Sequence, residues 1–522
     1  MTLRGLVERL AQCMTIAGHE AAAPAALDRR VTAVAYDSRR AALGAVFFAL
    51  RGQHADGALY AEQAVSRGAI AVIAETPAPP APPAHPVPWL VVGDARLALA
   101  EAAAAFYRHP AEELLTLGVT GTNGKTTTTY LLASIFDAAG YRCGRIGTIG
   151  YRIGLVEHES GRTTPEAPDL QRMLREMVDA RCAACAMEVS SHALALRRVD
   201  GMRFSAGVFT NLTRDHLDFH HGMEAYFQAK RRLFDLLGPG APAITNADDA
   251  YGARLAREWP GAVTFGLDAA ADVTVSRLEM TIHGTTGEIR TPRGPIRLQS
   301  GLVGRPNVSN ILAAAAVAVA LELPQDAIGQ GIAETGSVPG RFQMVADPGD
   351  DIAVVVDYAH TDDALRNLLE TARALTRCRL VTVFGCGGDR DRTKRPLMGA
   401  IAARLSDRVV LTSDNPRSED PLEIIEQIKR GLVPPERPVT RQGQAAAPPR
   451  TVPWTAIADR REAIEDAVRE AAPGDLVVVA GKGHERTQTI GSRVLPFDDV
   501  AVAREALAAR RQAKSRTPGG AA

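Results

Sequence analysis

The amino-acid sequence predicts an α/β protein of three domains, which we place at residues 1–112, 113–338 and 339–522. The chain has 522 residues, more than a single hydrophobic core usually supports. Short apolar runs of strand length alternate with longer segments that suit helices, a pattern typical of mostly parallel sheets covered by helices. One of these runs leads through a glycine-rich turn into a helix, which is a common arrangement in this fold class.

The composition excludes several classes of protein. Apolar residues make up 46% and charged residues 23%, and the 60 basic side chains balance the 60 acidic ones. This balance gives no global reason to expect nucleic acid or an anionic membrane as a partner. No apolar run approaches the roughly 18 residues of a membrane span, and residues 1–14 lack the apolar core of a signal peptide. We therefore expect no membrane span. A cytoplasmic location and a monomeric state are further expectations.

The six cysteines do not have the spacing of a zinc site. Cys182 and Cys185 form a C-x-x-C pair, which can be redox-active or can simply line a core. The pair leads directly into the apolar Ala186 and Met187. We therefore interpret both thiols as part of a core in a reducing compartment.

In the first domain, we expect strands at residues 45–50, 69–74 and 89–92 because these runs are apolar and short. The proline- and alanine-rich residues 76–88 are interpreted as a stiff surface connection between two of these strands. In the second domain, the alanine-rich residues 311–321 are too short to span a membrane and predict a buried helix.

The third domain begins near Gly340 and is expected to form a doubly wound, Rossmann-like sheet. Its strand candidates are residues 352–356, 380–384, 408–412 and 476–480. Residues 433–453 are rich in proline, glutamine and alanine and are interpreted as a surface insertion. Residues 514–522 are expected to form a disordered tail.

The strongest local motif is residues 117–127, an apolar strand end followed by a glycine turn and a helix. Gly121 and Gly124 allow the backbone to approach phosphate oxygens, and the N–H groups at the helix N-terminus bind negative charge. Lys125 would reach the β- and γ-phosphates, and the Thr126 hydroxyl would bind Mg²⁺. The strict P-loop pattern is not met, because Val119 stands where the first glycine belongs. The motif nevertheless predicts an ATP site.

The loop Gly-Thr-Asn-Gly-Lys-Thr-Thr (121–127) resembles that of the Mur ligases and folylpolyglutamate synthases rather than that of kinases. Further motifs along almost the whole chain match the Mur ligase family in its order. They are Asp-Ser-Arg (37–39), Met-Glu-Val-Ser-Ser-His (187–192), Asn-Leu-Thr-Arg-Asp-His-Leu-Asp (211–218), Ala-Lys (229–230), Asn-Val-Ser-Asn (307–310), Asp-Tyr-Ala-His-Thr (357–361), Gly-Cys-Gly-Gly-Asp-Arg (385–390), Asp-Asn-Pro-Arg (414–417) and Gly-Lys-Gly-His-Glu (481–485).

The resemblance implies a UDP-binding N-terminal domain, a central P-loop ATPase domain and a C-terminal Rossmann-like domain that receives an amino acid. It implies an ATP-dependent ligase of peptidoglycan synthesis. In the form closest to this sequence, meso-2,6-diaminopimelate is joined to UDP-N-acetylmuramoyl-L-alanyl-D-glutamate through an acyl phosphate. The protein would mainly position the reactants and neutralise charge, as in other phosphoryl transfers.

Four residues are expected to carry the chemistry: Lys125, Glu188, His216 and Lys230. The resemblance implies that Thr126 and Glu188 hold Mg²⁺, that His216 binds a second Mg²⁺, and that Lys230 is carbamylated by CO₂ and thereby becomes a metal ligand. Carbamylation requires a neutral amine, so the pKa of this lysine must be lowered. A solvated helix face is the alternative interpretation of the Lys-Arg-Arg run.

The resemblance also implies the residues that bind nucleotide and precursor. The ATP residues are Gly121, Thr122, Asn123, Gly124, Lys125, Thr126, Thr127, Asn310, Arg341 and Asp357. Arg341, just past the expected hinge at residues 338–340, would reach ATP from the C-terminal domain when the domains close. The precursor residues are Ser38, Gln53, His54, Ala55, Thr163, Thr164, Ser190 and Arg198. The chain departs from the common family pattern at Arg162 and Leu196.

The tetrad Asp414-Asn415-Pro416-Arg417 resembles that of diaminopimelate-adding enzymes, whereas lysine-adding relatives carry a different one. Diaminopimelate is lysine with a second carboxylate, and an arginine can hold that carboxylate through two charge-assisted hydrogen bonds. The full set expected at this substrate is Arg390, Asp414, Asn415, Pro416, Arg417, Gly481 and Glu485, with Glu485 facing the distal ammonium group.

Two other functions stay open at this point. One is a related ligase, which could use lysine, the D-alanyl-D-alanine dipeptide or a folate substrate. The tetrad argues against the last two, and the N-terminal motif at residues 37–39 argues against the folate enzyme. The other is a non-catalytic ATP-binding regulator, against which the joint presence of Glu188, His216 and Lys230 argues.

Overall fold

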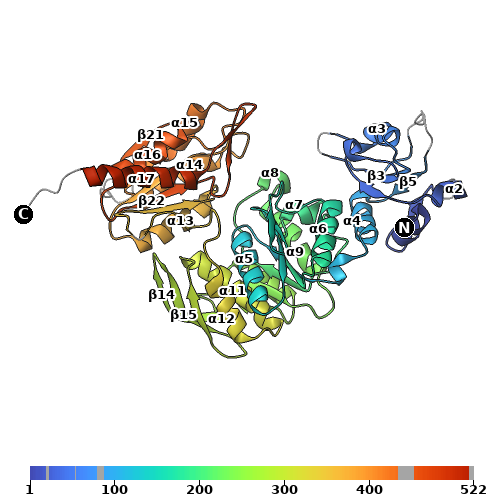
Figure 1. Ribbon diagram of the computed structural model, residues 1–522, viewed down its shortest axis with the longest axis horizontal. Coiled ribbons are helices and arrows are strands. Elements are labelled where there is room, and N and C mark those ends of the chain that lie inside the picture. The colour runs from blue at the N-terminus through green and yellow to red at the C-terminus, as the bar shows by residue number, and fades with distance from the viewer. Residues whose placement is uncertain (19–22, 53–54, 79–86, 348, 433–451, 517–522) are drawn as a thin grey trace, which may run out of the picture.

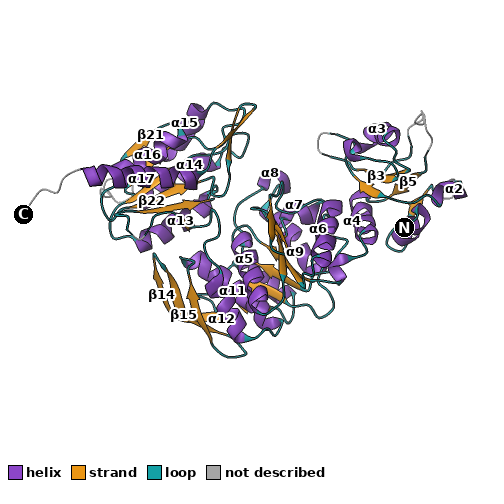
Figure 2. Cartoon of the chain, viewed as in Figure 1, coloured by secondary structure: helices purple, strands orange, loops and turns teal. Residues whose placement is uncertain are grey.

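The computed structural model describes residues 1–18, 23–52, 55–78, 87–347, 349–432 and 452–516. The chain runs from a small unit at one end, through a large central unit, to a third unit at the other end (Figure 1). Each of the three units is built around its own mostly parallel sheet with helices packed against it (Figure 2). The fold class expected from the sequence is thus the one observed.

The first unit contains a five-stranded sheet of order β1-β5-β4-β3-β2, in which only β1 is antiparallel. The strands are β1 (Ile16–Ala17), β2 (Ala33–Ala35), β3 (Ala45–Ala49), β4 (Ala71–Ala74) and β5 (Trp89–Val92). The helices are α1 (Leu3–Ala11), α2 (Pro24–Leu27), α3 (Ala61–Ser66) and α4 (Ala95–Phe106), with 3₁₀ turns η1 (Ser38–Arg40) and η2 (Gly57–Tyr60). The three expected strands are present as β3, β4 and β5. Most of the proline-rich connection at 76–88 lies outside the described residues.

The central unit contains an eight-stranded sheet of order β13-β12-β11-β6-β10-β7-β8-β9. Its strands are β6 (Leu115–Thr120), β7 (Cys143–Ile146), β8 (Tyr151–Ile153), β9 (Val156–His158), β10 (Ala184–Glu188), β11 (Ala206–Phe209), β12 (Ala243–Asn246) and β13 (Val263–Phe265). Neighbouring strands pair in parallel except at β8, which pairs antiparallel with both β7 and the edge strand β9. A separate antiparallel sheet is formed by β14 (Thr274–Thr281), β15 (Gly284–Arg290) and β16 (Ile296–Ser300).

The helices of the central unit are α5 (Lys125–Ala138), α6 (Ala167–Asp179), α7 (Ser191–Ala195), α8 (Leu217–His220), α9 (Met223–Asp235), α10 (Ala250–Glu258), α11 (Arg305–Ala320) and α12 (Gln325–Glu334), preceded by the 3₁₀ turn η3 (Pro110–Glu112). Residues 311–319 of α11 are fully buried or nearly so, as the alanine-rich sequence predicts. Cys182 and Cys185 are buried and form no disulfide, and burial raises the pKa of the Cys185 thiol. The interpretation of this pair as part of a core is confirmed.

The third unit contains a six-stranded sheet of order β17-β18-β22-β19-β20-β21, in which only β17 is antiparallel. The strands are β17 (Gln343–Met344), β18 (Ala353–Asp357), β19 (Leu380–Phe384), β20 (Arg408–Leu411), β21 (Trp454–Ala456) and β22 (Leu476–Ala480), followed by the hairpin β23 (Thr487–Ile490) and β24 (Arg493–Pro496). The helices are α13 (Asp362–Leu375), α14 (Lys394–Leu405), α15 (Pro421–Leu432), α16 (Arg460–Glu470) and α17 (Asp499–Arg516). All four expected strands are present.

Two features of the third unit bear on the expected surface segments. Residues 433–451 of the expected insertion lie outside the described residues, as do residues 517–522. The expected start of the tail at residue 514 is wrong, because α17 continues to Arg516. One face of this helix is buried near its middle, with Val502, Ala503 and Leu507 in the core.

The strand register aligns the carboxyl ends of the parallel strands in each of the two larger sheets, so the loops that follow these strands leave from one edge. In the central sheet, Glu188 at the end of β10 pairs with Val119, and Phe209 at the end of β11 pairs with Thr120. In the third unit, Asp357, Ala480, Phe384 and Leu411 form one row across the ends of four parallel strands. Ligands of open α/β sheets bind outside the carboxyl ends of their strands. The loops that leave these two rows therefore form the natural place for a site.

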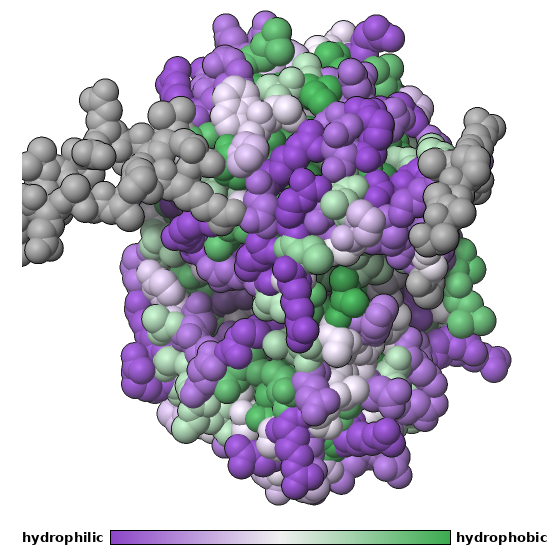
Figure 3. All heavy atoms as spheres, turned by 90° about the vertical axis from the view of Figure 1, so that its left-hand side faces the viewer, coloured by the Kyte–Doolittle hydropathy of each residue, from purple (hydrophilic) through white to green (hydrophobic). Residues whose placement is uncertain are grey.

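Among the described residues, no helix is both long and apolar enough to cross a bilayer. Hydrophilic side chains predominate on the face shown in Figure 3, and the hydrophobic ones on that face occur in small separate groups.

Candidate active site

The glycine loop between β6 and α5 has the backbone that phosphate binding requires. Gly121 (φ +145°) and Gly124 (φ +89°) both occupy the positive-φ region, which only glycine adopts readily. A Cβ at Gly121 would lie 1.9 Å from Thr210 Oγ1, and one at Gly124 would lie 2.3 Å from Asn310 Oδ1. The loop is thus pressed against β11 and α11. The first turn of α5, beginning at Lys125, follows directly, so its N–H groups point into the loop.

Two lysines share one carbonyl of this loop. Lys125 Nζ donates to Gly121 O at 2.9 Å and to Thr122 O at 2.7 Å, and Lys230 Nζ donates to Gly121 O at 2.6 Å. Burial lowers the pKa of Lys125, which Glu188 and Asp215 partly oppose. Burial, together with the charge of Lys125, lowers the pKa of Lys230 well below its ordinary value. The lowered pKa favours the neutral amine that carbamylation of Lys230 would need.

Glu188 ends β10 and is buried directly beside the loop. Its carboxylate accepts hydrogen bonds from Thr148 N at 2.8 Å and from Thr148 Oγ1 at 3.0 Å. Gly147 makes this approach possible, because a Cβ there would lie 2.4 Å from Glu188 Oε1. The carboxylate is thereby held in one orientation at the edge of the sheet.

His216 precedes α8 and has a left-handed backbone (φ +53°). Its Nε2 lies 3.4 Å from Asp215 Oδ2, and its ring lies edge-on to that of His192 at 4.8 Å between centroids. Desolvation lowers the pKa of His216 against the opposing charge of Asp215, so its imidazole is neutral and has a free lone pair at neutral pH. Across the described part of the chain, no group of three or more His, Cys, Asp or Glu side chains is placed to hold a metal ion.

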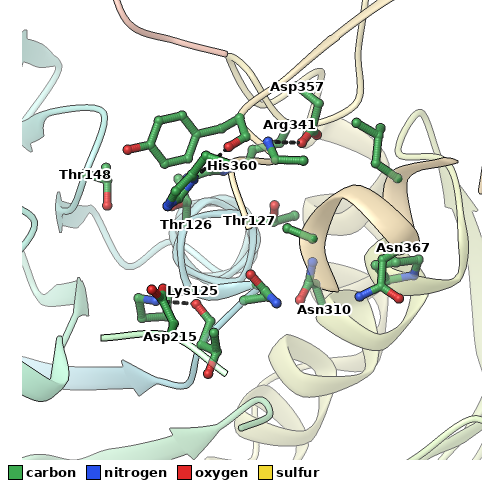
Figure 4. A pocket seen from close by; sticks show the side chains of 18 of the residues that line it. Lys125, Thr126, Thr127, Thr148, Asp215, Asn310, Arg341, Asp357, His360 and Asn367 are labelled. Carbon is green, nitrogen blue, oxygen red and sulfur yellow. Dashed lines mark hydrogen bonds between the residues drawn. The ribbon is translucent and has the colours of Figure 1, made fainter. Parts of the chain in front are cut away.

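A cavity of about 300 Å³ brings the loop together with the third unit. Figure 4 shows Arg341, Asp357 and His360 on one side of the first turn of α5, Lys125 and Asp215 on another, and Asn310 beside Asn367 on a third. Arg341 Nη2 donates to Thr126 Oγ1 at 3.1 Å, and Asn123 Nδ2 donates to Asp363 Oδ2 at 3.2 Å. All ten residues expected at ATP except Gly121 line this cavity, as do Glu188, His216 and Lys230.

A second cavity of about 830 Å³ lies along the carboxyl edge of the third sheet. It is lined by Arg390, Asp414, Asn415, Arg417, Gly481 and Glu485, which are all the residues expected at the amino acid except Pro416. Arg417 has a left-handed backbone (φ +52°), and its Nη1 donates to Gly388 O at 2.6 Å. The two cavities share Asp215, His216, Tyr358 and His360 in their walls.

The residues expected at the precursor fall into two groups. Thr163 and Ser190 line the first cavity, and Thr164 Oγ1 lies 3.3 Å from Ser190 Oγ. Arg198 donates to Thr164 O at 3.0 Å and pairs with Glu166 at 2.9 Å. Arg162 also pairs with Glu166, so this buried carboxylate joins two arginines.

Ser38 and Ala55 belong to the first unit instead. Ser38 Oγ donates to Gln63 Oε1 at 2.6 Å, and neither Ser38 nor Ala55 lines the two cavities. Gln53 and His54 lie outside the described residues. The first unit contacts the central one through Tyr36 OH, which donates to Asp169 Oδ2 at 2.7 Å. A precursor that used both groups would therefore have to be long.

Sequence reasoning assigned no role to several polar residues of the site. Thr148 orients Glu188, while Asp215 and His360 stand in both cavities. The last two lie inside motifs already noted, at residues 211–218 and 357–361, so the motifs could have indicated them. Thr148 carries no such signal, because only the tertiary contact with Glu188 distinguishes it from any other turn threonine.

Comparison with known proteins places the chain in one family. Three family models match it: the catalytic domain of the Mur ligase family over residues 30–107, the Mur ligase middle domain over 119–318, and the Mur ligase glutamate ligase domain over 340–483. A UDP-N-acetylmuramoyl-L-alanyl-D-glutamate–2,6-diaminopimelate ligase of Geobacter metallireducens is 47% identical over 494 residues, covering 92% of this chain and 94% of the relative. The ligase of the same name from Solibacter usitatus is 46% identical, with 93% and 95% covered.

Solved structures agree with these relatives. One UDP-N-acetylmuramoyl-L-alanyl-D-glutamate–2,6-diaminopimelate ligase superposes with a TM-score of 0.66 at 33% identity, covering 98% of this chain and 99% of its own. The MurF ligase of Thermotoga maritima, solved in complex with ADP, shares the fold with a TM-score of 0.60 at 17% identity, covering 93% and 99%. The three-unit architecture, the glycine loop and these matches together establish that the chain belongs to the Mur ligase family.

Proposed function

We propose that this ligase joins meso-2,6-diaminopimelate to UDP-N-acetylmuramoyl-L-alanyl-D-glutamate at the expense of ATP, in peptidoglycan synthesis. The observation that carries the proposal is the pair of cavities with a common wall. One contains the phosphate loop and the other contains the tetrad at residues 414–417. An enzyme that activates a carboxyl group and then passes it to an amine needs two such adjoining sites. The names of the relatives at 43–47% identity support the choice of substrates.

The reaction would proceed in two steps. The D-glutamyl carboxylate attacks the γ-phosphorus of ATP, which releases ADP and leaves an acyl phosphate. The amine of diaminopimelate then attacks the acyl carbon, inorganic phosphate leaves, and the amine loses a proton. Both steps join bound partners, so holding the reacting atoms in line supplies much of the rate. The wall formed by Asp215, His216, Tyr358 and His360 is where the acyl phosphate would meet the amine.

The phosphates of ATP would be held by the N–H groups of residues 121–126 and by Lys125, which is already aimed into the loop. Asn310 and Asp357 would contact the rest of the nucleotide. The donor set fits Mg²⁺, because Thr126 offers a hydroxyl and Glu188 a carboxylate, and Mg²⁺ prefers oxygen ligands. His216 would contribute to a second metal position. Mg²⁺ supplies neutralisation of the phosphate charge.

Lys230 fits this arrangement only in a modified form. A cationic amine repels a metal ion, whereas a carbamate offers carboxylate-like oxygens. The low pKa of Lys230 and its burial against Gly121 support carbamylation by CO₂, since the reaction consumes the neutral amine. We propose N6-carboxylysine at this position.

The long precursor would lie across the first two units. Its uridine diphosphate end would contact Ser38, Gln53, His54 and Ala55. Its peptide end would contact Thr163, Thr164, Ser190 and Arg198, which adjoin the phosphate loop. We accordingly assign residues 1–112 to the precursor, 113–338 to ATP and catalysis, and 339–522 to the amino acid.

A coupled assay tests the proposed function. Purified protein with ATP, Mg²⁺ and the muramoyl dipeptide should release phosphate with diaminopimelate and yield the tripeptide by mass spectrometry. L-lysine in a parallel reaction should be a poor substrate. Phosphate release without the precursor or amino acid would point to a regulatory ATPase, and preferential use of lysine or of a dipeptide would point to another member of the family.

Arg341→Ala should lower turnover about 10- to 100-fold while precursor binding stays within about twofold. The reason is that Arg341 reaches the loop from the third unit, and a charge-assisted hydrogen bond contributes about 1.5–3 kcal/mol. Steady-state kinetics and calorimetric titration of the precursor measure the two quantities. Arg511→Ala serves as the control. Arg511 is an exposed arginine of the same unit that pairs with Asp347 and lines neither cavity. A matching loss of precursor affinity would instead assign Arg341 to the precursor site.

A further inference from the structure

The loop that follows β22 turns a lysine away from solvent. Gly481 (φ +116°) and Gly483 (φ +54°) flank Lys482 and allow the loop to pass between two neighbouring loops. A Cβ at Gly481 would lie 2.6 Å from Asp414 Oδ2, and one at Gly483 would lie 2.8 Å from Tyr358 N. Lys482 itself has no exposed surface. The two glycines thus allow the backbone to pack closely against its neighbours, and the lysine side chain between them lies inside the protein.

Lys482 closes a ring of three side chains. Its Nζ donates to Glu485 Oε2 at 2.8 Å and to Asn415 Oδ1 at 3.1 Å. Asn415 Nδ2 donates to the same Glu485 Oε2 at 2.8 Å, and Asn415 Oδ1 also accepts from Thr489 N at 2.9 Å. The hairpin that begins with β23 therefore anchors the ring to the backbone. A buried ammonium group is tolerated only with such partners.

The ring leaves one carboxylate oxygen of Glu485 available. Its Oε2 accepts from two donors, whereas its Oε1 accepts no hydrogen bond from the described residues. Glu485 and Asn415 line the 830 Å³ cavity, and Lys482 is not among the described residues that line it. The lysine therefore cannot contact a molecule in the cavity directly and can act on it only through Glu485 and Asn415.

We propose that Lys482 is a positioning residue for the incoming amino acid, which holds Glu485 so that its free oxygen receives an ammonium group. The inference rests on the proposed function in one respect, namely that the amino acid carries two ammonium groups. Beyond the proposed function, recognition of the amino acid depends on the ammonium group of Lys482, which is buried behind the Glu485 carboxylate. This cation weakens the attraction of Glu485 for an ammonium group, so its benefit is geometric.

These two effects of Lys482 have opposite signs, which makes the proposal testable. Lys482→Met removes the charge and the hydrogen bonds at nearly constant length, and Lys482→Gln keeps an N–H donor. We expect the KM for diaminopimelate to rise at least ~10-fold in Lys482→Met and less in Lys482→Gln, with kcat changing less than KM. The KM values for ATP and precursor should stay within about twofold. Lys429→Met is the matched control, because Lys429 lies on α15 outside both cavities and pairs with Glu426.

A double-mutant cycle shows whether Lys482 acts through Glu485. In a Glu485→Gln background, Lys482→Met should have little further effect on the KM for the amino acid, because the two residues act as a unit. Additive effects, an unchanged or lower KM in Lys482→Met, or equal losses for all three substrates would overturn the proposal. If Lys482→Met fails to fold in thermal unfolding, Lys482→Gln decides the same question. Should wild type use another amino acid, the proposed function fails separately, and the cycle is run with that amino acid.

Discussion

Replacing Lys230 by alanine should remove most of the ligase activity while ATP still binds almost normally. The lysine lies on the buried face of α9. Its Nζ donates to the carbonyl oxygen of Gly121, whereas the phosphates of ATP would bind the backbone N–H groups of the loop. Its proposed carbamate would hold the metal ion that neutralises the transferring phosphoryl group, so its loss falls on the transition state. We expect kcat to fall by at least ~100-fold, a loss of about 2.7 kcal/mol of transition-state stabilisation.

The measurement combines single-turnover kinetics with nucleotide titration. Arg231→Ala is the matched control, because Arg231 follows Lys230 on the same helix but points outward to Glu258. NMR after equilibration with ¹³C-bicarbonate should show a carbamate signal in wild type that is absent from Lys230→Ala. Activity of the wild type should also fall in CO₂-depleted buffer. Turnover of Lys230→Ala within about threefold of wild type, about 0.7 kcal/mol, would rule out the carbamate role.

Arg417→Ala should reduce the catalytic efficiency for diaminopimelate by at least ~100-fold, because each charge-assisted hydrogen bond to the distal carboxylate contributes about 1.5–3 kcal/mol. Arg417 lines the amino-acid cavity, where its guanidinium is already oriented by Gly388 O. L-lysine lacks the second carboxylate, so its poor use should change little. The preference for diaminopimelate over L-lysine should therefore be largely lost. It should not reverse, because removing the Arg417 guanidinium creates no new contact with lysine.

Competition kinetics with both amino acids measure this preference. Arg417→Lys should not restore it, since a point charge cannot replace the planar fork of a guanidinium. Alanine and lysine face the same strain at φ +52°, so the comparison between these two variants is matched for backbone effects. Arg392→Ala is the control, because Arg392 is largely exposed and pairs with Glu419. Unchanged discrimination in Arg417→Ala would remove the main reason for naming diaminopimelate.

Local sequence was sufficient to predict a structural feature wherever the residues that cause the feature are neighbours in the chain. The apolar runs at 45–49, 380–384 and 476–480 are strands because each is short, apolar and bounded by turn residues. The glycine loop at 121–124 was predictable because positive φ is nearly restricted to glycine. The family, and with it the kind of reaction, followed from motifs spread over the chain. The individual site roles and the domain limits stay predictions.

Lys230 shows where local sequence was not sufficient. Its neighbours Arg231 and Arg232 made a solvated face the alternative interpretation, and the packing of α9 is what buries Lys230. Successive helix residues differ by about 100° in direction, so one of three consecutive cations can be buried while the others are not. The low pKa of Lys230 then comes from burial and from Lys125, which is more than one hundred residues earlier in the chain.

The sequence by itself determined the α/β class, the order of strands and helices, the phosphate loop and membership of the family, because these depend on short-range patterns and on the order of motifs along one chain. Only the tertiary structure decided which motifs share a wall, that Thr148 orients Glu188, and that Lys482 lies buried behind Glu485. The physical reason is that distance and burial arise from strand register and from packing between units. Asp215 and His360, far apart in sequence, meet in both cavities because two sheet edges face each other.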